Sequence, residues 1–375
     1  MQMHLKNLNI KSFRGIRELL LEDLSSINIL TGDNNSGKTS VLEVIESLEA
    51  PADINMWMKL GRSERNAVRG LSLYDGLINL FSLDDDSPII CYKAQFLSEE
   101  IAEIELHLKR EIANLSLSQY ERLSGISFLY DGDGDQPKLY SRPEVEINEA
   151  ERLIISFFLN GKKAAENELY DIDNHISIRK PRSKPGSPDI TYISPTRHVE
   201  GILYLNSVLD NPELYEQMLE ILKEFDPGII SINVDNANER TRRGNVYKIL
   251  SKEHDSALPL NVYGDGMKKA VLLMSAVVKS KGGILLLDEF ETAIHTTAMQ
   301  RVFSWILTAC IKLDVQLFLT THSEEALDKV LKCCPELQDK IKVYTLYNNK
   351  DKTVVRSLIA EKAIEAKDEM GLELR

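Results

Sequence analysis

The feature that most constrains the fold of this chain is a glycine-rich segment from Gly32 to Ser40, which reads Gly-Asp-Asn-Asn-Ser-Gly-Lys-Thr-Ser. An apolar run that contains Ile27, Ile29 and Leu30 precedes the segment, and apolar residues at helical spacing follow it. In a strand, loop and helix of this order, glycines let the backbone N–H groups and the helix N-terminus face an anion. The order therefore predicts a phosphate-binding loop.

The residues of this loop predict the chemistry of its ligand. We expect Lys38 to reach the β- and γ-phosphates of a nucleoside triphosphate, and the Thr39 hydroxyl to be a ligand of Mg²⁺. The other residues expected around the phosphates are Gly32, Asn34, Asn35, Ser36, Gly37 and Ser40. A simple turn between a strand and a helix would not need the full spacing. The predicted cofactors are therefore ATP and Mg²⁺.

Two apolar runs in the second half of the chain end in polar residues. The first ends at Asp288 and Glu289, and the second ends shortly before His322. Because ligands bind at the carboxyl ends of strands in open α/β sheets, we expect these side chains to join the phosphate-binding loop. Asp288 would hold Mg²⁺ and Glu289 would act on the attacking water as general base. The His322 imidazole would hydrogen-bond the γ-phosphate or the water.

Three further positions carry more than one interpretation. The turn Gly264-Asp-Gly266 precedes a predicted helix over 270–279 and can bind an anion; in clamp-type ATPases such a turn closes on the γ-phosphate of a facing subunit. Arg14 is either a surface arginine or a cation that folds back towards the phosphates. Gln95, in a predicted strand over 89–96, either faces solvent or contacts Mg²⁺ or water.

Composition excludes several classes of function. A formal net charge of −13 excludes a protein that coats nucleic acid through a basic surface, so any DNA contact is local. The four cysteines lack metal-ligand spacing, which favours a reducing, cytoplasmic compartment. No signal-peptide core or membrane-spanning run is visible, so we expect no membrane contact. The candidate DNA contacts are Arg179, Lys180, Arg182 and Lys184.

As a set, these motifs resemble the ABC-type ATPases of the SMC, RecF and OLD group, in particular the small stand-alone OLD-like AAA ATPases. The run from Leu8 to Gly15 resembles the opening strand, the loop from Gly32 to Ser40 the Walker A motif, and Leu287-Asp288-Glu289 the Walker B motif. The segments that stand at the signature, the D-loop and the H-loop are 264–269, 291–295 and 320–323.

This sequence departs from the group in two respects. The signature lacks its Leu-Ser-Gly-Gly form, and Asp265 stands between the two glycines. OLD-type nucleases continue into a metal-binding Toprim domain, for which we expect no room after His322. We therefore expect no nuclease activity of the chain itself.

The resemblance implies an α/β ABC-type ATPase head, a mixed sheet flanked by helices, with an inserted helical subdomain. We expect an N-terminal lobe with Walker A over 1–96, a helical insertion over 97–189, and a C-terminal lobe with the signature turn, Walker B and the H-loop over 190–375. Apolar residues at helical spacing over 98–117, and a similar pattern over 144–169, support a helical insertion.

The function that the resemblance implies is an ATP-hydrolysing switch that works as a homodimer or a higher oligomer. Stand-alone members often regulate a separately encoded effector, frequently a nuclease, in phage defence. Two alternatives remain open: a RecF-like ATPase that acts directly on DNA in repair, and a nucleotide-binding scaffold with negligible turnover. The acidic charge favours regulation over direct action on DNA, and Glu289 argues against a scaffold.

Overall fold

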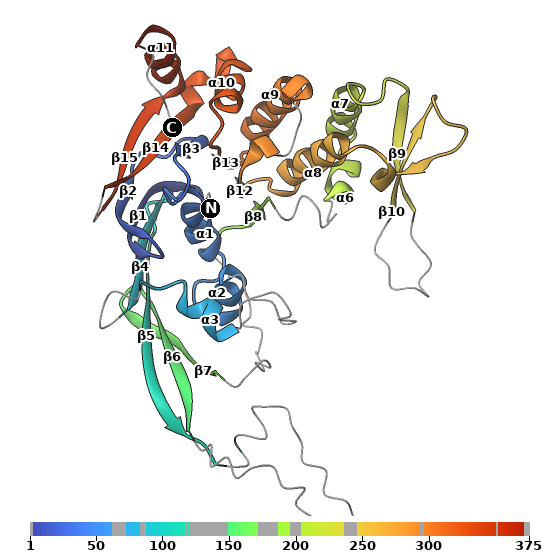
Figure 1. Ribbon diagram of the computed structural model, residues 1–375. Coiled ribbons are helices and arrows are strands. Elements are labelled where there is room, and N and C mark those ends of the chain that lie inside the picture. The colour runs from blue at the N-terminus through green and yellow to red at the C-terminus, as the bar shows by residue number, and fades with distance from the viewer. Residues whose placement is uncertain are drawn as a thin grey trace, which may run out of the picture.

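The structure, a computed structural model, describes residues 3–61, 73–82, 88–116, 119, 149–171, 187–195, 204–235, 246–292, 296–349 and 352–370. The candidate DNA contacts over 179–184 lie outside the described residues, as does 293–295 at the end of the D-loop segment. The strands of the described residues form three sheets, with helices packed beside them (Figure 1).

The central sheet joins strands from both halves of the chain. Its order is β15 (Lys352–Ile359), β14 (Ile341–Asn349), β3 (Ile27–Gly32), β13 (Gln316–Thr320), β12 (Ile284–Leu287) and β8 (Ile190–Ile193). All neighbouring pairs are parallel except β14 with β15. Strands β3, β8, β12 and β13 are buried at every residue, as parallel strands covered on both faces require. The carboxyl ends of β3, β13 and β12 therefore meet at one edge.

Side chains of this sheet alternate between two hydrophobic cores, because successive residues of a strand face opposite sides. On β3, Ile29 packs in one core and Leu30 in the other, and Leu317 and Phe318 of β13 divide in the same way. The first core contains α6 (Leu205–Leu209), α7 (Pro212–Leu222), α8 (Asp265–Lys279), α9 (Thr296–Lys312), α10 (Glu324–Lys332) and α11 (Ala360–Met370). The second contains α1 (Lys38–Ser47), α2 (Ile54–Leu60) and α3 (Leu73–Ile78). Short 3₁₀ turns are η1 (Leu260–Val262), η2 (Phe290–Thr292) and η3 (Pro335–Lys340).

The second sheet is antiparallel throughout and corrects the expected helical insertion. Its order is β2 (Ile16–Leu21), β1 (Leu5–Phe13), β4 (Ile89–Phe96), β5 (Ile101–Asn114), β6 (Glu149–Leu159) and β7 (Lys162–Tyr170). The expectation of helices over 98–117 and 144–169 is wrong, because the described residues of these segments form strands. How the chain divides into domains stays a prediction.

The error has a physical reason that can be read in β5. Ile101 and Ile112 fit a helical spacing, but their side chains are 47% and 71% exposed. The buried residues are Ile104, Leu106 and Leu108, which alternate with the period of a strand. A short apolar run can match both the helical period and the strand period. Pairing with a neighbouring strand then decides which structure forms.

A turn signal between β6 and β7 also pointed to strands. Asn160 and Gly161 have φ values of 49° and 73°, the left-handed conformation that a two-residue hairpin turn requires at both positions. Asn-Gly is the residue pair most typical of that turn.

A small third sheet stands apart from the other two. It consists of β9 (Ile229–Asp235), β10 (Val246–Ser251) and β11 (Leu258–Pro259), with β10 in the centre. Figure 1 shows it beside α7 and α8, far from α1. In the part of the chain that the structure describes, none of the helices is long and apolar enough to span a membrane.

We expect Gly161→Ala to lower the free energy of unfolding by about 1 to 2 kcal/mol, since a Cβ disfavours the left-handed conformation. Gly15→Ala is the matched control, because a Cβ there meets no atom within 4 Å and Gly15 is not at a positive φ. Urea denaturation followed by circular dichroism measures both. Equal effects of the two substitutions would contradict a left-handed turn at Gly161.

Candidate functional site

The loop between β3 and α1 needs glycine at two positions for both conformation and space. Gly32 has a φ of 133° and Gly37 a φ of 99°, in the left-handed region. A Cβ on Gly32 would lie 2.4 Å from the carbonyl oxygen of Leu346, and a Cβ on Gly37 would lie 3.0 Å from Cγ1 of Ile16. Strand β14 therefore approaches Gly32 too closely for a Cβ, and at Gly37 the left-handed φ together with the tight contact with Ile16 of β2 favours glycine.

A residue of β14 also supports the loop through a hydrogen bond. The side-chain amide of Asn348 donates from Nδ2 to the carbonyl oxygen of Asn35 at 2.8 Å. Asn35 itself has a φ of 64°, in the left-handed region that asparagine adopts more readily than most residues other than glycine. Sequence analysis missed Asn348, because no motif links the end of a distant strand to this loop.

Lys38 lies inside the loop. Its ammonium donates to the carbonyl oxygens of Gly32 at 2.7 Å and Asp33 at 2.8 Å, and only 9% of the residue is exposed. Burial lowers the pKa of Lys38, and the nearby carboxylates, Asp288 first and Glu291 second, oppose that shift. The lysine is therefore placed at the centre of the predicted phosphate site, where phosphate oxygens would replace the two carbonyl oxygens.

Asp288, directly after β12, accepts hydrogen bonds from three hydroxyl groups. Thr39 Oγ1 lies 3.0 Å from Oδ2, Tyr192 OH lies 3.1 Å from Oδ2, and Thr320 Oγ1 lies 2.5 Å from Oδ1. Burial, and then the charge of Asp288, raise the pKa of Tyr192 far above its usual range, so its hydroxyl stays a donor. Sequence analysis missed Tyr192 and the part played by Thr320.

The pairing of Thr39 with Asp288 fits a magnesium ion. Both side chains offer hard oxygen ligands, and Mg²⁺ in nucleotide sites takes one or two protein oxygens and completes its shell with phosphates and water. The described residues contain no group of three or more His, Cys, Asp or Glu side chains that could hold a metal by themselves. Thr39 and Asp288 are therefore the residues that would hold the ion together with a nucleotide.

Glu289 has a backbone conformation that its neighbours hold in place. Its φ is 48°, which costs about 1 kcal/mol or more for a residue other than glycine. Its N–H donates to Thr320 Oγ1 at 2.8 Å, and its carbonyl oxygen accepts from the N–H of Thr292 at 3.0 Å. The half-buried side chain of Glu289 is thus held next to Asp288, where a general base would be needed.

His322 follows β13 and contacts the carboxylate of Glu291. The sequence placed Glu291 in the D-loop segment and gave it no other role. Oε1 of Glu291 lies 3.1 Å from Nδ1 of His322 and accepts the backbone N–H of His322 at 3.0 Å. The Glu291 side chain is 11% exposed and that of His322 is 48% exposed. The structure thus brings together Lys38, Thr39, Asp288 and, beside them, the pair of Glu291 and His322.

The turn at Gly264 is one of the predicted site elements that the structure leaves apart from the loop at Lys38. Gly264 caps α8, and Asp265 forms an ion pair with Lys268 in the first turn of that helix. Among the described contacts, none joins Gly264 or Gly266 to the loop at Lys38. Figure 1 shows α8 on the side of the third sheet, away from α1.

Arg14 and Gln95 make other contacts in this structure. Arg14 forms an ion pair with Glu43 of α1 at 3.1 Å and donates to the carbonyl oxygen of Leu60 at 2.7 Å, so it links α1 to α2. Gln95 accepts from Asn7 at 2.8 Å on the neighbouring strand β1. A role of Arg14 towards phosphate stays a prediction.

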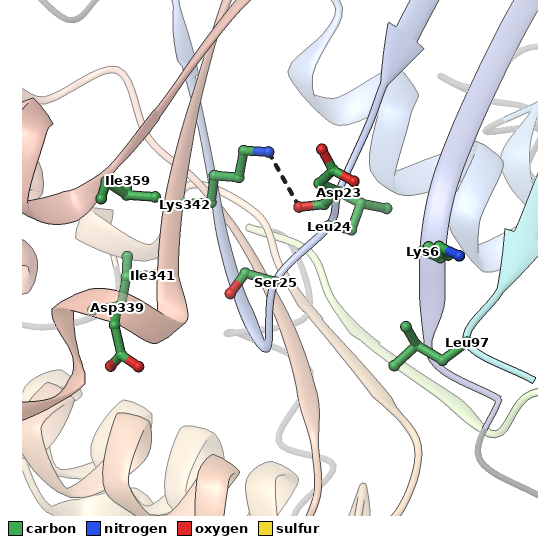
Figure 2. Close-up of a pocket in the computed structure, with 9 residues that line it drawn as sticks. All are labelled: Lys6, Asp23, Leu24, Ser25, Leu97, Asp339, Ile341, Lys342 and Ile359. Atoms are coloured by element: carbon green, nitrogen blue, oxygen red, sulfur yellow. Dashed lines mark hydrogen bonds between the residues drawn. The ribbon is translucent and has the colours of Figure 1, made fainter.

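A pocket of about 400 Å³ lies elsewhere and is a different site. Figure 2 shows Ser25, Ile341 and Lys342 on its wall. Ser25 precedes β3 and Ile341 begins β14, so the pocket lies at the amino ends of these parallel strands. The phosphate-binding loop follows the carboxyl end of β3, at the opposite edge of the sheet.

The geometry defines the class of the protein. A lysine in a glycine loop, and a threonine that meets an aspartate at the end of a buried parallel strand, form the site of a P-loop ATPase. The chain belongs to the family described as "AAA domain, putative AbiEii toxin, Type IV TA system", which matches residues 27–328. The P-loop ATPase class expected from the sequence is thereby confirmed.

Individual relatives agree with this class. The chain is 22% identical over 366 residues to an "ATP/GTP phosphatase" of Helicobacter pylori, with 88% of each chain covered. It is 51% identical over 43 residues, 12% of each chain, to the "DNA replication and repair protein RecF" of Pseudoalteromonas translucida. Its fold is similar to that of an SMC head bound to the C-terminal winged-helix domain of ScpA, with a TM-score of 0.50 and 13% identity. The match covers 96% of this chain and 99% of the SMC head chain. The α/β ABC-type head expected from the sequence is confirmed.

We expect Lys38→Ala to weaken ATP binding about 100-fold, since it removes the buried cation at the centre of the loop. Titration with a fluorescent ATP analogue measures the affinity. Lys279→Ala is the matched control, because Lys279 is exposed and pairs with Asp189 at 3.5 Å. An unchanged affinity of Lys38→Ala would show that this loop is not the nucleotide site.

Proposed function

We propose that the chain is an ATP-hydrolysing switch that dimerises on ATP and regulates a separately encoded effector, with a nuclease as the expected effector. The observation that supports a dimer is the position of the Gly264 turn. Within one copy the described contacts do not bring this turn to Lys38, whereas a second copy facing the first can supply it. Each ATP site would then contain residues of two copies.

The residues of one copy suggest how hydrolysis proceeds. Lys38 would exchange the carbonyl oxygens of Gly32 and Asp33 for phosphate oxygens and neutralise their charge. The Mg²⁺ that Thr39 and Asp288 would hold supplies further charge neutralisation when bound. Glu289 would accept a proton from water as the water oxygen attacks the γ-phosphorus and the bond to ADP breaks.

A contact between α8 and η2 supports communication from the dimer interface to the site. The ammonium of Lys269, in the first turns of α8, donates to the carbonyl oxygen of Thr292 at 2.5 Å. The turn η2 begins directly after Glu289 and carries Glu291. A second copy that presses on the start of α8 would therefore act on the turn that follows the proposed base, Glu289.

The regulatory role is supported by the family and by charge. The family description names a toxin and a TA system, which is consistent with a partner protein. The net charge of −13 disfavours extended contact with DNA, although a local contact through the 179–184 stretch remains part of the proposal. The resemblance to stand-alone OLD-like ATPases supports a role in phage defence.

We expect Glu289→Gln to bind ATP but not to hydrolyse it, because an amide cannot accept the proton of the attacking water. The ATP-bound dimer should therefore accumulate, which light scattering after size-exclusion chromatography measures. Lys38→Ala, which should bind ATP about 100-fold more weakly, is the control and should stay monomeric at an ATP concentration that saturates only the wild type. Undiminished hydrolysis by Glu289→Gln would exclude Glu289 as the base.

We expect subunit mixing to restore activity if the site is shared between copies. Gly264→Glu should be inactive alone, because its carboxylate would repel the γ-phosphate of the facing copy, and a Cβ at Gly264 meets nothing within 4 Å in its own copy. An equal mixture of Gly264→Glu and Lys38→Ala should recover about a quarter of wild-type ATPase activity, since half of the dimers then contain one intact site. No recovery on mixing would contradict a shared site.

The same variants distinguish regulation of a protein effector from direct action on DNA. We expect a stoichiometric protein partner to co-purify from native extract and to differ in occupancy between Glu289→Gln and Lys38→Ala. Anisotropy of a labelled DNA duplex measures the alternative. Salt-sensitive duplex binding in the absence of any protein partner would favour direct action on DNA.

A further inference from the structure

The carboxylate of Glu291 determines how the imidazole of His322 can act. One oxygen, Oε1, accepts the backbone N–H of His322 at 3.0 Å and lies 3.1 Å from Nδ1 of the ring. The contact between the ring and Oε1 is an ion-pair distance, and the negative charge of an ionised carboxylate favours a hydrogen over a lone pair on the nearer ring nitrogen, Nδ1. In the neutral ring, Nε2 then carries the lone pair and is directed away from Glu291.

Glu291 is held in a rigid turn. The preceding residue, Phe290, is fully buried and packs on Phe303 with ring centroids 4.8 Å apart. The following residue, Thr292, donates its N–H to Glu289 and accepts from Lys269. The backbone on both sides is therefore fixed, and the position of the carboxylate is set by the same turn that positions Glu289.

Within the part of the chain that the structure describes, the second oxygen of this carboxylate makes no contact that would draw the side chain away from His322. Oε2 of Glu291 is buried and has no hydrogen-bond partner among the described residues. A buried polar atom without a protein partner is unfavourable unless a water molecule or a ligand binds it. The charge of Glu291, after that of Asp288, opposes the lowering of the pKa of Lys38 by burial, as a carboxylate near the phosphate site would.

We propose that Glu291 is a positioning residue that fixes the Nδ1–H tautomer of His322, so that Nε2 of the neutral ring accepts a hydrogen from the attacking water. This inference rests on the proposed hydrolysis at Lys38 and Asp288. It assigns different tasks to two carboxylates that lie two residues apart. Glu289 takes the proton, whereas Glu291 orients the histidine that holds the water.

The tautomer can be measured directly in protein labelled with ¹⁵N-histidine, at a pH where the ring is neutral. The chain has seven histidines, and His322→Gln identifies the signal of His322. We expect the Nδ1–H pattern in the wild type and in Glu291→Gln, whose amide oxygen still accepts the hydrogen. We expect Glu291→Ala to shift the signal towards the Nε2–H tautomer. An Nε2–H pattern in the wild type, or no change in Glu291→Ala, would overturn the proposal.

Steady-state kinetics test whether Glu291 acts through His322. We expect Glu291→Ala to lower kcat about 10- to 100-fold, the range typical of groups that orient a functional imidazole, with little change in ATP affinity. Glu291→Gln should retain most of the activity, in contrast to Glu289→Gln. In a His322→Ala background, Glu291→Ala should have little further effect, because the two substitutions remove one function.

The outcomes separate this inference from the proposed function. If Glu291→Gln were as inactive as Glu291→Ala and the effects of Glu291→Ala and His322→Ala multiplied, Glu291 would act by its own charge and the positioning role would be wrong. The proposed switch would still stand. If wild-type protein failed to hydrolyse ATP, while its His322 signal still showed the Nδ1–H pattern and Glu291→Ala still changed it, the proposed function would fail and the positioning contact would remain.

Discussion

The hydrogen bonds to the buried carboxylate of Asp288 are the interaction on which the rest of the site depends. A buried carboxylate without partners is strongly unfavourable. Here three hydroxyls from α1, β8 and β13 reach it, at Thr39, Tyr192 and Thr320. Because Thr39 lies in the first half of the chain and Tyr192 and Thr320 lie in the second, the same charge that would hold a metal ion also joins α1 to the central sheet.

Elements outside the nucleotide site determine its shape. The loop before α1 is in contact with Ile16 of β2 on one side and with Leu346 and Asn348 of β14 on the other. The antiparallel sheet and the last strands of the chain thus support the loop, although neither Ile16 nor the residues of β14 belong to a motif. The turn η2 similarly joins Glu289 and Glu291 to α8, the helix that a second copy would face.

Sequence reasoning succeeded where a local pattern has only one physical solution. The spacing from Gly32 to Thr39 and the continuous apolar runs of β12 and β13 predicted the parallel sheet and the edge at which the polar residues gather. It failed over 98–117 and 144–169, where apolar residues fit both the helical and the strand period. Pairing of β5 with β4 and β6 resolved that ambiguity, and such pairing is not visible in a short segment.

The sequence by itself determined the chemistry of the nucleotide loop and the identity of the residues at the strand ends, because both depend on spacing along the chain. Only the tertiary structure decided which other side chains contact these strand-end residues. Tyr192, Thr320 and Glu291 meet Asp288 or His322 through contacts across a parallel sheet, between residues far apart in the sequence. Those contacts depend on the register of neighbouring strands, which is a property of the whole fold.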